Sequence, residues 1–159
     1  MHNKLIISLF FLFACIKIQE QLNTVNIVRK DIICYARQHY YRIEKSYNIN
    51  KPPLYYLIIK EPLYEVSFCF GPSKLSTIKT LENFVTFKEK MKKGDSFEYT
   101  DYLGNKFSIF YLDTENWKHI VLLNKEYFVR NVNGTKFHPA GELSYALENL
   151  IKRFKKSKE

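Results

Sequence analysis

The chain has 159 residues and a formal net charge of +9, with 25 lysine and arginine residues against 16 aspartate and glutamate residues. Of the basic residues 20 are lysine and only 5 are arginine, whereas arginine is the residue that binds phosphates and base edges through two parallel hydrogen bonds. The composition therefore disfavours nucleic-acid binding. The positive charge is better suited to binding an anionic envelope surface or an acidic protein partner.

The chain begins with a short apolar segment. Lys4 precedes residues 5–14, in which only Ser8 is polar. A membrane-spanning helix needs roughly 20 apolar residues, so this segment is too short to span and is typical of a secretory signal peptide. We expect residues 1–14 to be a signal peptide, residues 15–24 to be a short tether, and residues 25–159 to form a single α+β domain.

The end of this segment resembles the lipobox of bacterial lipoproteins. The four residues are Leu12, Phe13, Ala14 and Cys15, and Phe13 departs from the motif because that position usually holds a small or β-branched residue. The resemblance covers only the first fifteen residues, and it implies lipidation of Cys15 and attachment to the outer or periplasmic side of a membrane. A plain secreted protein is one alternative, and an uncleaved anchor or a buried core helix is another.

In the first half of the domain, apolar residues at spacings of three and four predict an amphipathic helix over residues 25–47. The asparagine and proline residues of 48–53 end that helix. Residues 54–60 and 63–70 read as two strands joined at Glu61 and Pro62.

A second helix follows, and Gly94 is expected to be its left-handed stop; its predicted apolar face consists of Leu81, Phe84, Val85, the stem of Lys88, and Met91. Short turns then predict a meander of four antiparallel strands over 97–102, 106–112, 117–123 and 126–130. After a loop at 131–138, Pro139 is expected to open a third helix, with an apolar face of Leu143, Leu147, Leu150 and Phe154. The order α-β-β-α-β-β-β-β-α predicts an α+β fold with helices packed on a mostly antiparallel sheet.

The cysteine and histidine residues give no catalytic or metal-binding pattern. Once Cys15 carries lipid, Cys34 and Cys69 remain as an even pair, so they can form a disulfide or stay as two buried free thiols. Five residues of helix would place Cys34 and His39 about 140° apart around the axis, too far for a nucleophile and its base. The short spacings typical of zinc ligands are absent among His39, His119 and His138.

The polar turns are equally unspecific. Asp113 and Glu115 lie in a predicted turn beside Trp117, where an aspartate that bonds to its own backbone explains Asp113 without catalysis. The tripeptide Asn133-Gly134-Thr135 is a glycosylation acceptor if the source is eukaryotic, and it is no phosphate-binding loop. We therefore predict no catalytic residue, no metal and no cofactor, and we do not expect an enzyme.

Two surface features can mediate binding. The first is a basic patch at the end of the third predicted helix, which either complements the helix dipole in solvent or binds an anionic membrane or partner; it consists of Lys152, Arg153, Lys155, Lys156 and Lys158. The second is the strand over 106–112, which is partly apolar on both faces. If helices leave one face of the sheet uncovered, that face would bind a ligand or a protein.

Together these features predict an exported, lipid-anchored binding protein of the cell envelope. We expect its partner to be another protein, in an immunity, inhibitor or accessory role. A carrier of an apolar small molecule or lipid in a sheet-lined cavity is the first alternative, and a plain secreted protein of unknown role is the second. The sequence does not predict the oligomeric state.

Overall fold

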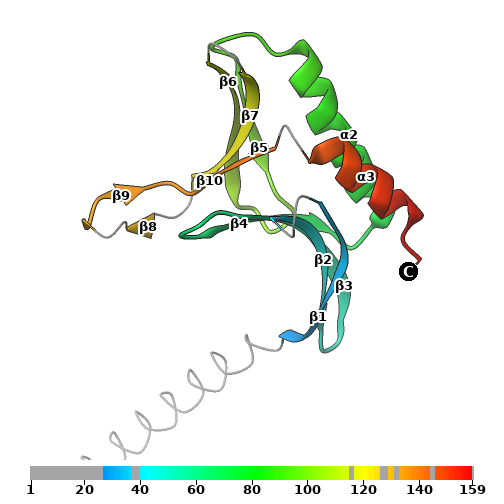
Figure 1. Ribbon diagram of the computed structural model, residues 1–159. Helices are drawn as coiled ribbons and strands as arrows, with labels where there is room; N and C mark the ends of the chain where they lie inside the picture. Colours follow the sequence, from blue (N-terminus) through cyan, green and yellow to red (C-terminus); the bar gives the residue numbers. More distant parts are fainter. Residues whose placement is uncertain are drawn as a thin grey trace, which may run out of the picture.

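The structure is a computed structural model that describes residues 27–36, 40–114, 117–125, 129–130, 133–143 and 146–158. In this part of the chain, antiparallel strands form two four-stranded sheets and a two-stranded pair, and two helices lie side by side against the sheets (Figure 1). The predicted α+β class with mostly antiparallel strands is confirmed, whereas the predicted order of helices and strands is matched only in part.

The first sheet has the strand order β1-β2-β3-β4. Its strands are β1 (Ile27–Ala36), β2 (Tyr41–Asn48), β3 (Lys51–Lys60) and β4 (Glu65–Gly71). Ile43, Leu57 and Phe68 are partners across three adjacent strands, and all are buried on the face toward the helices. The predicted strand pair at 54–60 and 63–70 is confirmed as β3 and β4.

The predicted helix over 25–47 is wrong, because its described residues form the hairpin of β1 and β2. Most of the apolar residues that suggested a helix are β-branched or aromatic, which favours strands. The pairing register of β1 also shifts between Ile32 and Cys34. Such an irregularity breaks the two-residue alternation of a strand, so the apolar spacing resembles that of a helix.

The second sheet has the strand order β10-β7-β6-β5. Its strands are β5 (Ser96–Thr100), β6 (Lys106–Thr114), β7 (Trp117–Asn124) and β10 (Ala140–Glu142). The first three match the predicted meander, but the fourth predicted strand is misplaced. Its described end, β8 (Val129–Arg130), pairs with β9 (Lys136–Phe137) in an arm that projects from the two sheets (Figure 1).

Pro139 does not open a helix, because the chain after it continues as β10 beside β7. The backbone N–H of Asn124 donates to the carbonyl of Pro139 at 2.9 Å. A Cβ at Gly141 would lie 2.7 Å from Cγ2 of Ile59, so glycine lets β10 pass close to the first sheet. The last helix, α3 (Leu147–Lys156), begins later than expected.

Both helices bury the faces that the sequence predicts. Helix α2 (Lys74–Lys90) is capped by the Ser73 side chain and ends at Met91. Gly94 has a φ of 91°, but it lies in the turn after the helix and does not end it. The buried residues of α3 are Leu147, Leu150, Ile151 and Phe154, and the predicted Leu143 is buried just before the helix.

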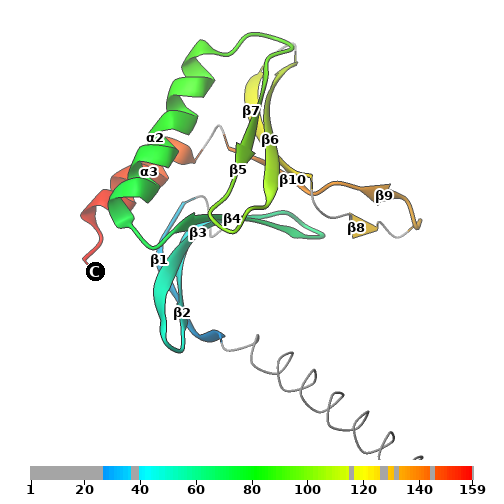
Figure 2. The ribbon, with the colours of Figure 1, turned by 180° about the vertical axis from the view of Figure 1, so that it is seen from behind.

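One aromatic cluster joins the two sheets to α2. The ring of Phe68 on β4 lies 5.0 Å from the ring of Phe107 on β6 and 5.7 Å from that of Phe84 on α2. The inner face of β6 is filled, since Phe107, Ile109 and Tyr111 are all buried. In the view from behind (Figure 2), the two helices cover the side on which the two sheets diverge from each other.

Candidate binding surface

The outer edge of β1 is the open edge of the first sheet. Strand β1 is ten residues long, and no other described strand pairs with the side that faces away from β2. An edge strand presents backbone N–H and C=O groups that can pair with another chain. This edge is therefore the first element of a candidate binding surface.

On the opposite edge of the same sheet, Cys69 of β4 is bonded to the turn between β5 and β6. The N–H of Tyr102 donates to the carbonyl of Cys69 on β4 at 2.9 Å, and the N–H of Cys69 donates to the carboxylate of Asp101 at 3.3 Å. Asp101 also accepts from the N–H groups of Leu103 and Asn105 at 2.9 and 2.8 Å and from the side-chain amide of Asn105 at 2.9 Å. The buried Asp101 therefore stabilises this turn. In the sequence, the only sign of this role is that turn-forming residues follow Asp101.

Helix α3 lies beside β1. The thiol of Cys34 contacts the carbonyl of Leu150 at 3.8 Å. Nη1 of Arg153 donates to the carbonyl of Tyr35 at 2.9 Å, and the guanidinium lies 5.6 Å from the centre of the Tyr35 ring. These contacts join parts of the chain that are more than a hundred residues apart in sequence.

Between this helix and the strand lies an open groove of about 480 Å³, which we call the β1–α3 groove. It is lined by Ile32, Ile33, Cys34, Tyr35, Arg153, Lys156 and Ser157. The residues Ile32 and Tyr35 are 54% and 41% exposed. Two cations and no carboxylate line the groove, so it suits a ligand that is both apolar and anionic.

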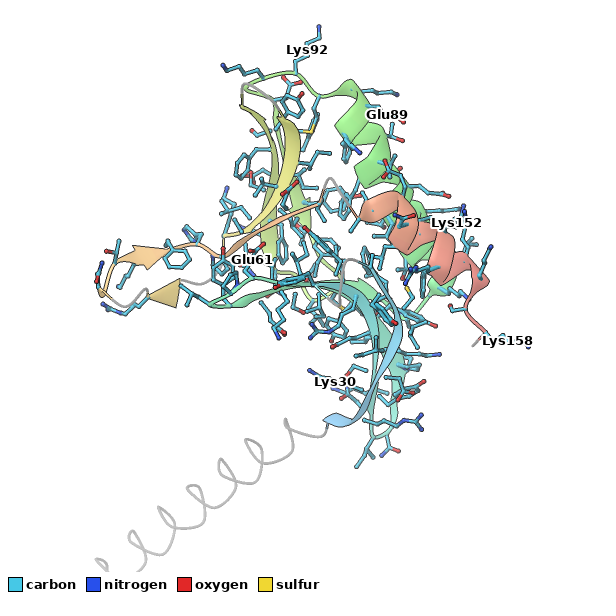
Figure 3. The ribbon with its side chains drawn as sticks, viewed as in Figure 1. Lys30, Glu61, Glu89, Lys92, Lys152 and Lys158 are labelled. Carbon is cyan, nitrogen blue, oxygen red and sulfur yellow. The ribbon has the colours of Figure 1, made fainter. Side chains whose placement is uncertain are left out.

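The structure divides the predicted basic patch between two places. Arg153 and Lys156 line the β1–α3 groove, whereas Lys155 pairs with Glu82 of α2 at 2.6 Å. Lys152 lines a separate hollow between α2 and α3, and Lys158 lies beyond the end of α3 (Figure 3). The patch is therefore not one continuous positive surface.

The hollow between α2 and α3 has a mixed charge. Its volume is about 500 Å³, and its charged lining residues are Glu82, Glu89, Glu148, Lys152 and Lys155. Exposed ion pairs of this kind contribute little binding or stability. We therefore assign no ligand to this hollow.

A charged network lies on the outer face of the first sheet. The guanidinium of Arg42 contacts the carboxylate of Glu44 at 2.6 Å and that of Glu65 at 3.0 Å. Nearby, burial raises the pKa of the Tyr56 hydroxyl and of the Cys69 thiol, and these two groups hydrogen bond to each other. Since each of these groups pairs with another group of the same sheet, we interpret the network as stabilising the sheet and assign it no ligand.

The disulfide considered between Cys34 and Cys69 is not formed, and both residues are buried free thiols. They lie on β1 and β4, which are three strand spacings or about 14 Å apart. A disulfide needs Cα atoms within about 7 Å of each other. The structure therefore contains the alternative of two buried free thiols.

Several sequence candidates lie outside the described residues or side chains. Cys15, His39 and Glu115 are not among the described residues, and the side chains of Asp113, Trp117 and His119 are not described. His138 is half-buried, and Asn133, Gly134 and Thr135 are exposed in the turn between β8 and β9. The described part of the chain contains no group of three or more His, Cys, Asp or Glu residues that could hold a metal ion.

No helix in the described ranges is long and apolar enough to cross a membrane. Comparisons of the chain with known protein families, with curated proteins and with solved structures found no match. The assignment of function therefore depends on the chain itself.

The buried thiol of Cys34 gives a first testable prediction. Burial raises its pKa from 9.0 to about 11, so only roughly 0.1% of it is thiolate at pH 8. We expect iodoacetamide to alkylate Cys34 of the folded protein very slowly at pH 8 and faster as the pH approaches 11, as measured by peptide mass spectrometry. The matched control is the same protein in concentrated guanidinium chloride, where Cys34 should react readily. Rapid alkylation of the folded protein at pH 8, or a peptide linking Cys34 to Cys69, would contradict the structure.

Proposed function

We propose that this chain is an exported, lipid-anchored binding protein of the cell envelope, and that it binds another protein through the β1–α3 groove. The observation that carries the proposal is the open edge of β1, beside which exposed Ile32 and Tyr35 meet Arg153 and Lys156. We propose no reaction for this site.

The shape and chemistry of the groove support a protein partner over a small apolar ligand. Protein interfaces combine exposed aromatic and apolar side chains with arginine and a polar rim. A carrier would instead need an apolar cavity that surrounds its ligand, and the inner face of β6 is occupied by buried side chains that include Phe107 and Ile109. We therefore favour the protein partner.

The overall charge supports an acidic partner. Removal of residues 1–14, whose one charged side chain is Lys4, lowers the formal net charge from +9 to +8, and this charge attracts negatively charged surfaces over a distance of about one Debye length. Two of the positive side chains, Arg153 and Lys156, line the groove itself. Charges in such positions speed association and select the partner.

The proposed anchor would keep this surface near a membrane. Twelve residue steps separate Cys15 from Ile27, the first residue of β1. Twelve residues can reach at most roughly 40 Å. A lipid on Cys15 would therefore hold β1 within reach of other proteins of the same envelope.

Photocrosslinking in cells tests the proposed surface. With p-benzoylphenylalanine at position 32, we expect a specific protein adduct, because Ile32 is exposed in the groove. The matched control places the same residue at Leu63, which is 67% exposed outside the groove. Lys156→Glu should lower the adduct yield at position 32. An adduct at position 63 of equal yield, or none at position 32, would contradict the proposal.

Cell fractionation tests the proposed lipid anchor. Replacing Cys15 by serine removes the thiol that would receive the lipid, so we expect Cys15→Ser to move the protein from the membrane fraction to the soluble fraction. Cys34→Ser is the matched control, because the buried Cys34 also loses a thiol but should leave membrane attachment unchanged. Membrane attachment that persists in Cys15→Ser would refute the anchor.

A further inference from the structure

We infer that the segment bound at the β1–α3 groove is an extended acidic strand of the partner, which extends the first sheet by pairing with β1. This inference depends on the proposed function, since it specifies the chemistry of the protein partner at the same surface. It rests on the open sheet edge, on the arrangement of apolar and basic side chains along it, and on the pairing of the nearby carboxylates.

The sheet edges of the protein are not equivalent. The edge of β4 is bonded to the turn that contains Asp101 and Tyr102. Strand β5, at the edge of the second sheet, has five residues and carries the exposed Glu98, which pairs with Lys125. Strand β1 has ten residues and is the longest outer strand in the described sheets, so it offers the most backbone for a new strand.

The contact between Arg153 and Tyr35 sets one end of the pairing region. Because Arg153 already donates to the carbonyl of Tyr35, an added strand would run along the part of β1 that precedes this residue. The stretch from Arg29 to Ile33 spans about 13 Å. A segment of about five residues would cover this stretch.

The side chains along this stretch define the sequence of the partner. Lys30 and Ile32 pair with Ser46 and Glu44 of β2, so they share the outer face of the sheet. Lys30 lies toward the start of β1 (Figure 3). Arg153 and Lys156 line the groove at the other end of the stretch, beside Ile32 and Ile33. An added strand would therefore place acidic residues near both ends and an apolar residue beside Ile32.

The carboxylates near this edge are already paired. Asp31 is held by the guanidinium of Arg29 at 2.8 Å. The buried Glu44 is held by Arg42 at 2.6 Å. Neither carboxylate therefore offsets the positive potential of the groove by as much as an unpaired acid would, and this favours an acidic segment over a basic one.

Selection from a library of random displayed peptides, with the full-length protein in detergent as bait, tests this inference. We expect peptides with an acidic residue two positions from a β-branched or aromatic residue, as the shared face of Lys30 and Ile32 requires, and a second acidic residue at the other end. A selected peptide should lose about tenfold in affinity when the amides that face β1 are N-methylated, because those amides form the pairing hydrogen bonds. Methylation of the alternate amides, which face away, is the matched peptide control.

Protein variants complete the test. We expect the double variant Arg153→Glu, Lys156→Glu to bind a selected peptide about tenfold more weakly, and Lys156→Glu alone, which keeps the contact between Arg153 and Tyr35, to show a smaller loss. Lys152→Glu is the matched control, because Lys152 lies on the same helix but lines the hollow between α2 and α3. The affinity of this variant for the selected peptide should be unchanged. The affinities are measured by fluorescence anisotropy.

Other outcomes would overturn the inference. Selected peptides without acidic residues, equal losses from both methylation patterns, or a failure to select any peptide would each do so. Binding to phosphatidylglycerol vesicles that depends on Arg153 and Lys156, without peptide binding, would assign the groove to a membrane surface. If crosslinking at position 32 succeeds while peptides fail, the protein partner remains and only its extended acidic segment is refuted.

Discussion

The packing of Phe68 between the two sheets and α2 is the constraint on which the rest of the structure depends. Its ring contacts rings from β6 and α2, so β4 must lie where the two sheets meet. Removing such a buried aromatic side chain costs about 3–5 kcal/mol in typical cores. Because the chain order of the first sheet is also its spatial order, placing β4 at this junction leaves β1 as the outermost strand.

The two edges of the first sheet consequently differ in chemistry. The β4 edge is bonded by the turn at Asp101, whereas the β1 edge faces the groove beside α3. Proteins usually protect exposed edges with charges or bulges, since an open edge invites pairing with other chains. Here the bond from Arg153 to Tyr35 ends the open stretch, and Lys30 and the start of the irregularity after Ile32 lie within it. A short, positively charged edge would select its partner and would disfavour pairing between copies of this basic chain.

The sequence predicts elements that depend on local signals. The strand pair of β3 and β4 follows from the turns at 48–53 and at Glu61 and Pro62, and α2 follows from its apolar spacing. The hairpin of β1 and β2 could not be distinguished from a helix, because an irregular strand rich in Tyr and Ile also places apolar residues three and four apart. Strand β10 has three residues and exists because β7 and Ile59 lie beside it, which no local pattern reveals.

The candidate surface shows the same limit. The sequence shows the basic residues of α3, but which of them line the proposed binding groove depends on tertiary contacts. Lys155 is engaged by Glu82, whereas Arg153 and Lys156 meet a strand that is far away in the chain. Lipidation of Cys15 stays a prediction from the first residues, because Cys15 lies outside the described residues.

Residue-resolved amide hydrogen exchange of the free protein tests the central claim, that β1 is an open edge whereas β4 is bonded at Cys69 to the turn that contains Asp101. The account predicts slow exchange at Cys69 and Tyr102, whose N–H groups are bonded at the β4 edge. It predicts much faster exchange at those amides of β1 between Arg29 and Ile33 that point away from β2, since exposed, unbonded amides exchange without local unfolding. Equal protection of both edges would show that β1 is already covered, and it would contradict the account.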